Sequence, residues 1–113
     1  MLAKIIKLRV FNDAGGKMTC SLQDVAGGLL IVSQFTLAAD VSAGNRPSFT
    51  GAAAPDEARR LYNCFVARAR LLPPVVHTGQ FGANMQLHLV NDGPVAIAVQ
   101  MTPAVTSDLL LNQ

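Results

Sequence analysis

The spacing of hydrophobic residues predicts one amphipathic helix, over residues 55–72. Apolar side chains recur there at every third or fourth position, which places them on one face of a helix. Pro55 suits the first helical turn, and Asp56 and Glu57 suit the positive end of the helix dipole. The two prolines that follow the range cannot continue a helix. The predicted apolar stripe consists of Ala58, Leu61, Tyr62, Phe65, Val66, Ala69 and Leu72.

Shorter apolar runs predict strands before and after this helix. The run at 28–33 is continuously apolar, which is typical of a central strand covered on both faces. Other runs alternate apolar and polar residues, as half-buried strands do. Gly15 and Gly16 supply a turn, and residues 2–6 have helical spacing. We therefore predict an α+β fold with a mostly antiparallel sheet, its strands near 8–12, 18–22, 28–33, 75–78, 85–90 and 95–101.

Composition favours one soluble domain over residues 1–113. Half of the 113 residues are apolar and 14% are charged, which favours a buried core. The net charge of +2 is too small for a field that neutralises roughly 6–10 phosphates of a long nucleic acid, although contact with one end of a polynucleotide stays open. No apolar run reaches the ~20 residues that span a bilayer. Cys20 and Cys64 are far apart, so we expect a reducing, cytoplasmic location.

The sequence contains few candidates for catalysis. It has no nucleophile elbow, phosphate-binding loop or dinucleotide-binding motif. Its two histidines, His77 and His88, belong to predicted strands and are more simply structural. No cluster of histidines and carboxylates has metal-ligand spacing, so we expect neither a metal nor a cofactor.

Two stretches are unusual for ordinary strand ends. Residues 33–36 place three polar side chains after a buried strand, either to satisfy nearby backbone groups or to line a site. In the second stretch, Gly93-Pro94 follows Asn91-Asp92. Read alone, this stretch is a hairpin turn, but a proline directly after the glycine leaves open that the backbone is presented to a ligand.

Together the two stretches resemble the D-aminoacyl-tRNA deacylase family. Ser33-Gln34-Phe35-Thr36-Leu37 resembles the first family motif, S-Q-F-T-L. Asn91-Asp92-Gly93-Pro94-Val95 is similar to the second motif, N-x-G-P-V-T. The resemblance runs from about residue 3 to residue 101 and includes 44–49, Pro55-Asp56, Leu61-Tyr62, Phe65, Thr78-Gly79, 81–83 and Met85-Gln86.

The resemblance implies a function and a barrel-like fold. Members of the family hydrolyse the ester between a D-amino acid and the 3′-terminal adenosine of tRNA, and they also clear glycine mischarged on tRNA-Ala. They act in translation quality control as homodimers, without a cofactor, and DNA is not an expected partner. A cis Gly-Pro peptide enters the pocket of the partner and excludes L side chains by collision. A trans peptide would instead suit a related deacylase for a small L-amino acid.

The resemblance also implies roles for individual residues. Ser33, Gln34, Phe35 and Thr36 would line the catalytic pocket, with the Phe35–Thr36 backbone as the oxyanion donor. The 2′-OH of the tRNA would assist the attack, or Thr36 would be the nucleophile. The substrate-binding residues would be Asn91, Gly93 and Pro94, together with Phe81 and Met85 near the adenosine.

The sequence departs from the family pattern at two places. Ala96 stands where the second motif ends in Thr. Family members also begin with roughly forty further residues, which carry strands, a helix and an arginine that orients the Gly-Pro carbonyls. We therefore expect a chain shortened at its N-terminus. These departures favour an alternative, an inactive dimeric module that binds tRNA or protein.

Overall fold

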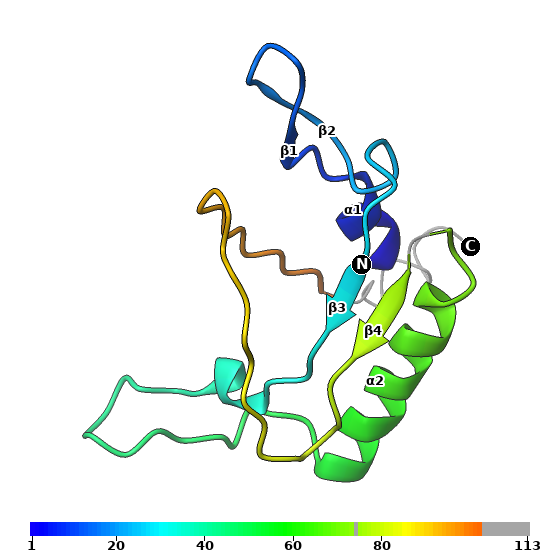
Figure 1. Ribbon diagram of the computed structural model, residues 1–113. Coiled ribbons are helices and arrows are strands. Elements are labelled where there is room, and N and C mark those ends of the chain that lie inside the picture. The colour runs from blue at the N-terminus through cyan, green and yellow to red at the C-terminus, as the bar shows by residue number, and fades with distance from the viewer. Residues whose placement is uncertain (74, 103–113) are drawn as a thin grey trace, which may run out of the picture.

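A computed structural model describes residues 1–73 and 75–102 of the chain. Its elements are short except for one helix, which runs beside a pair of strands (Figure 1). In chain order they are α1 (Leu2–Lys7), β1 (Phe11–Asn12), β2 (Met18–Cys20), β3 (Leu29–Ile31), a 3₁₀ helix η1 (Phe35–Ala38), α2 (Pro55–Ala69) and β4 (Val76–Thr78).

The central unit consists of β3, α2 and β4. The two strands are parallel, with Leu29 opposite Val76 and Ile31 opposite Thr78. Parallel neighbours need a crossover connection, usually a helix, and α2 provides it (Figure 1). The predicted strands at 28–33 and 75–78 are thus confirmed, and both end at the same edge of the unit. Polar residues after β3 therefore lie close to the chain that leaves β4.

Helix α2 confirms the predicted amphipathic helix but ends earlier than predicted. It stops at Ala69 instead of Leu72. The Arg70 amide still donates four residues back, to Val66, but the amides of Leu71 and Leu72 donate to carbonyls only three residues back, those of Arg68 and Ala69. A residue before proline is disfavoured in the α conformation, so the last turn tightens ahead of Pro73. The helix starts at Pro55 without a side-chain cap at Ala54.

The predicted barrel-like, mostly antiparallel sheet is not what the described residues form. They contain one antiparallel pair, β1 with β2, and one parallel pair, β3 with β4. The predicted strands at 85–90 and 95–101 have no strand assignment and follow β4 as a long irregular segment (Figure 1). Alternating apolar residues favour extended backbone, but a strand needs a neighbour that supplies hydrogen bonds. No strand within residues 1–73 and 75–102 pairs with residues 85–90 or 95–101.

The buried core of the described residues is small. Its apolar members are Ile6, Leu22, Val66 and Ala69. Only the last two belong to the predicted apolar stripe of α2, and Leu61 of that stripe is 50% exposed. Leu30 of β3 is 53% exposed, so the prediction of a strand covered on both faces is wrong. A strand in a two-stranded sheet is an edge strand, and only one face of β3–β4 meets a helix.

The β1–β2 hairpin turns at Gly16, whose φ of 80° is the left-handed conformation that glycine adopts readily. The Asp13 carboxylate fixes this turn. It accepts hydrogen bonds from the backbone N–H of Gly15 at 2.9 Å and of Lys17 at 3.0 Å, and from the hydroxyl of Thr19 at 2.8 Å. The ionised carboxylate is thus a structural part of the hairpin.

Protonation of Asp13 by acid should loosen this hairpin. The Lys17 amide, helped by the Thr19 hydroxyl and the Gly15 amide, lowers the pKa of Asp13 below the ordinary value of 3.8. A lowered folded-state pKa means that the stabilisation is complete above 3.8 and disappears as pH falls through the folded-state value. NMR titration of the Asp13 carboxyl measures its pKa, and the Gly15 amide signal reports the loosening of the turn. Thr19→Val removes one donor and should raise the pKa of Asp13, and an unchanged titration curve in that variant contradicts the assignment.

Candidate functional site

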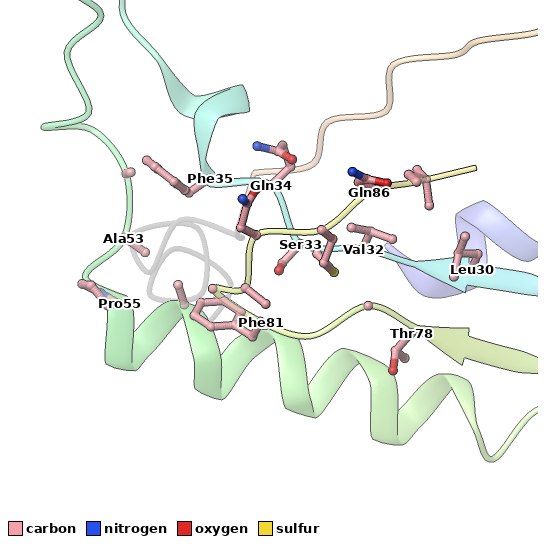
Figure 2. Close-up of a pocket in the computed structure, with 18 residues that line it drawn as sticks. Leu30, Val32, Ser33, Gln34, Phe35, Ala53, Pro55, Thr78, Phe81 and Gln86 are labelled. Atoms are coloured by element: carbon pink, nitrogen blue, oxygen red, sulfur yellow. The ribbon is translucent and has the colours of Figure 1, made fainter. Parts of the chain in front are cut away.

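A pocket of about 720 Å³ opens where β3 ends, between the start of α2 and the chain that leaves β4 (Figure 2). In Figure 2 the side chain of Ser33 lies between the end of β3 and Phe81. The walls are mostly apolar, with a few hydroxyl and amide groups. The lining residues are Leu30, Val32, Ser33, Gln34, Phe35, Ala52, Ala53, Pro55, Ala58, Thr78, Gly79, Phe81, Gly82, Ala83, Asn84, Met85, Gln86 and Leu87.

The first motif forms one wall of the pocket. Ser33, Gln34 and Phe35 line it, whereas Thr36 does not. Thr36 lies in η1, where its hydroxyl accepts a hydrogen bond from the Gln34 side-chain amide at 2.5 Å. Phe35 packs edge-to-face on Phe49, with ring centroids 5.0 Å apart. Thr36 therefore orients Gln34 and does not face the pocket.

The chain after β4 forms the opposite wall. Phe81 lines the pocket, and its ring centroid lies 5.8 Å from that of Tyr62 on α2. Met85 folds back over Gly79, and its sulfur accepts a hydrogen bond from the Gln80 amide at 3.3 Å. A Cβ at Gly79 would come within 2.9 Å of that sulfur, so the glycine makes room for Met85.

The two walls are joined at the carbonyl of Ile31, the last residue of β3. Its oxygen accepts a hydrogen bond from the Gly79 amide at 3.1 Å and another from the Tyr62 hydroxyl at 2.9 Å. The Tyr62 hydroxyl also lies 3.5 Å from the Gly79 carbonyl oxygen. Strand β3, helix α2 and the segment after β4 thus meet at one atom, two residues before Ser33.

Removing the Tyr62 hydroxyl should weaken this junction. We expect Tyr62→Phe to lower the free energy of unfolding by about 1 kcal/mol, the usual contribution of one hydrogen bond that is partly shielded from water. Urea denaturation followed by circular dichroism measures the change. Thr50→Val is the control, because the Thr50 hydroxyl is exposed and its nearest partner, Ser48 Oγ, is 3.4 Å away. Equal midpoints for the two variants contradict the role given to Tyr62.

The lining contains no ionisable side chain among the described residues. Ser33, Thr78, Gln34, Asn84 and Gln86 supply its side-chain hydrogen-bonding groups. Across residues 1–73 and 75–102, no three His, Cys, Asp or Glu side chains are grouped so that they could hold a metal ion. No helix within the same residues is long and apolar enough to cross a membrane. Polar chemistry in the pocket is therefore limited to neutral side chains and backbone groups.

The second motif lies outside this pocket. Asn91, Gly93 and Pro94 are exposed and belong to the irregular segment that follows β4 (Figure 1). The Gly93–Pro94 peptide bond is cis, as the resemblance implies. A Cβ at Gly93 would meet the backbone nitrogen of Val95 at 2.7 Å. The structure thus brings together Ser33, Gln34, Phe35, Phe81 and Met85, but not Thr36, Asn91, Gly93 and Pro94.

Several residues in or beside the pocket could not be identified from the sequence. Ala52 and Ala53 line the pocket but have no reactive group. The exposed Arg59 lies outside the lining, with its guanidinium 4.8 Å from the centroid of the Phe81 ring. This contact joins residues far apart in sequence, and only the fold brings them together. Asn84 also lines the pocket. Its place between residues 81–83 and Met85, which carry the family resemblance, is the one signal that the sequence offers for it.

The chain is similar to known proteins over most of its length. A family model described as D-Tyr-tRNA(Tyr) deacylase matches residues 1–100. The D-aminoacyl-tRNA deacylase of Variovorax paradoxus (strain S110) is 71% identical over 101 residues, which are 89% of this chain and 69% of that protein. The protein of the same name from Albidiferax ferrireducens is 67% identical over 108 residues, 91% of this chain and 68% of the relative.

A solved structure named c-Myc DNA Unwinding Element Binding Protein is also similar. It superimposes with a TM-score of 0.81 at 42% identity and covers 91% of this chain and 70% of its own. Family model, relatives and structure all extend across both motifs and the pocket between α2 and the β3–β4 pair. The resemblance seen in the two motifs is confirmed: the chain belongs to the D-aminoacyl-tRNA deacylase family.

Proposed function

We propose that this chain hydrolyses the ester bond of D-aminoacyl-tRNA and releases the free D-amino acid and tRNA. The observation that carries the proposal is the pocket. It joins Ser33, Gln34 and Phe35 of the first motif to Phe81 and Met85, in a chain that belongs to this family. The activity is that of a proofreading enzyme of translation, and we place it in the cytoplasm.

The apolar walls suit the adenosine at the end of tRNA. Phe81 presents an aromatic side chain to the pocket, and base stacking on such a ring contributes about 1–3 kcal/mol. Met85 adds a polarisable side chain that adapts to a flat ligand. The volume of about 720 Å³ falls in the range of small-molecule pockets, and it suits a nucleoside that carries an amino acid.

The polar wall suits the ester. Phe35 and Thr36 belong to the first turn of η1, where backbone N–H groups have no acceptor within the helix. We assign these two N–H groups to the oxyanion that forms when water attacks the ester carbon. The C–O bond to the ribose then breaks, and the 3′-oxygen takes a proton. Because no ionisable side chain lines the described pocket, we assign the assisting group to the neighbouring 2′-OH of the substrate.

We further propose that the second motif acts in a second copy of the chain. Asn91, Gly93 and Pro94 are exposed and lie outside the pocket of their own chain, which supports a role across a homodimer. A backbone placed in the partner's pocket collides with an L side chain and admits a D side chain. Glycine has no side chain to collide, so the proposal extends to glycine mischarged on tRNA-Ala.

Parallel assays of D-tyrosyl-tRNA and L-tyrosyl-tRNA test the proposal. We expect rapid loss of the D-ester while the L-ester persists at the rate seen without protein. A third substrate, D-tyrosyl-tRNA ending in 2′-deoxyadenosine, should be hydrolysed slowly because the assisting hydroxyl is gone. Equal rates for the D- and L-esters defeat the chiral function. Tight tRNA binding without any turnover would instead support the non-catalytic module.

A further inference from the structure

A fixed positive charge lies beside the pocket, on helix α2. The Arg59 guanidinium lies 4.8 Å from the centroid of the Phe81 ring, at a distance typical of a cation–π contact. Phe81 lines the pocket, and so does Ala58, the residue before Arg59. The ring therefore holds the cation beside a lining residue, while Arg59 itself stays outside the lining.

Arg59 differs from its neighbour Arg60 in its partners. Arg60 donates two hydrogen bonds to the Glu57 carboxylate, one of them from Nε at 2.8 Å, so its charge is compensated. Arg59 makes neither an ion pair nor a side-chain hydrogen bond within residues 1–73 and 75–102. Its five N–H donors lie in the plane of the guanidinium, so contact with the ring leaves them available to an oxyanion.

The ligand that combines a pocket-sized group with an adjacent anion is a nucleotide. The walls of the pocket are neutral among the described residues, so they accept a nucleoside but leave a phosphate unmatched. A planar guanidinium beside the pocket matches phosphate oxygens in a bidentate arrangement. We propose that Arg59 binds the 5′-phosphate of the terminal adenosine, the group that links it to the rest of the tRNA. This assignment rests on the proposed function, in which the pocket receives that adenosine.

Comparing the affinities for adenosine and for adenosine 5′-monophosphate separates the contribution of the phosphate from that of the nucleoside. Calorimetry at low ionic strength should show that the wild-type chain binds the monophosphate roughly fivefold more tightly, as expected for one exposed ion pair. Arg59→Gln should remove this preference, and Arg59→Lys should keep part of it, because lysine retains the charge but not the planar donors. Arg60→Gln is the matched control on the next residue and should keep the full preference.

Several results would overturn the assignment. They are a preference that survives in Arg59→Gln, a preference that Arg60→Gln removes equally, and the absence of any preference or any binding in the wild-type chain. Inorganic phosphate at the same concentration should leave the bound monophosphate in place; displacement would show a general anion site and count against the proposal.

Hydrolysis assays with the same variants keep the two proposals apart. Arg59→Gln should raise the KM for D-tyrosyl-tRNA roughly fivefold and leave kcat unchanged. A wild-type chain that prefers the monophosphate but does not hydrolyse the D-ester refutes the proposed function alone. A chain that hydrolyses the D-ester without a phosphate preference at Arg59 refutes this inference alone.

Discussion

Replacing Gly93 with alanine should lower the hydrolysis of D-tyrosyl-tRNA by about a hundredfold, the scale of loss that a 1 Å misplacement of a reacting group produces. The added Cβ would stand 2.7 Å from the backbone nitrogen of Val95 and 3.2 Å from one of its methyl groups. A backbone atom cannot rotate away as a side chain can, so the chain around Gly93 has to move. The proposed contact with the partner's pocket would move with it.

The stability of the Gly93→Ala variant should stay close to that of the wild type, because Gly93 and its neighbours are exposed. Gly51→Ala is the matched control, since a Cβ there meets nothing within 4 Å, and it should keep full activity. Single-turnover hydrolysis and thermal unfolding of both variants make the comparison. A Gly93→Ala variant with wild-type activity would show that the second motif does not act through its backbone position.

The largest effect on stability should come from Ala69→Glu. Ala69 is 0% exposed and lies on α2 one turn after Val66, which is 7% exposed. A carboxylate at this position is buried without a partner, which destabilises a protein by about 3–5 kcal/mol. The variant also adds volume to a contact that has no space. Since total stabilities are only about 5–15 kcal/mol, we expect loss of most of the folded population in mild urea.

Ala67→Glu separates burial from other effects of the substitution. Ala67 is exposed on the same last turn of α2, so the change in charge and in helix propensity is nearly the same. Urea denaturation followed by far-ultraviolet circular dichroism should give Ala67→Glu a midpoint near that of the wild type. Equal losses in the two variants would mean that the packing of α2 on the sheet is not what holds the helix.

The parts of the fold that are specified locally could be predicted from the sequence. The spacing of Ala58, Tyr62, Val66 and Ala69 identified α2, and Gly16 identified the first hairpin. The predicted strands at 85–90 and 95–101 were wrong in the described residues, because alternation specifies an extended backbone and not the neighbour that completes a strand. The exposure of Leu30 has the same origin: a continuous apolar run does not state how many layers cover it.

The candidate site was predictable only where its residues are chemically distinctive. The resemblance pointed to five residues that the pocket unites: Ser33, Gln34, Phe35, Phe81 and Met85. Thr36 carries a reactive hydroxyl, but that hydroxyl accepts a hydrogen bond from the Gln34 side chain and does not line the pocket. The contact of Arg59 with Phe81 depends on how α2 lies against the chain after β4, which no local pattern encodes.

The junction at Ile31 also bears on how such a pocket changes during evolution. The acceptor that joins both walls is a main-chain oxygen, and every residue type at position 31 supplies one. Mutation can therefore alter the side chains that face the substrate, one by one, without removing the acceptor at the joint between the walls. Substrate preference can therefore change during evolution while the backbone junction between the two walls is retained.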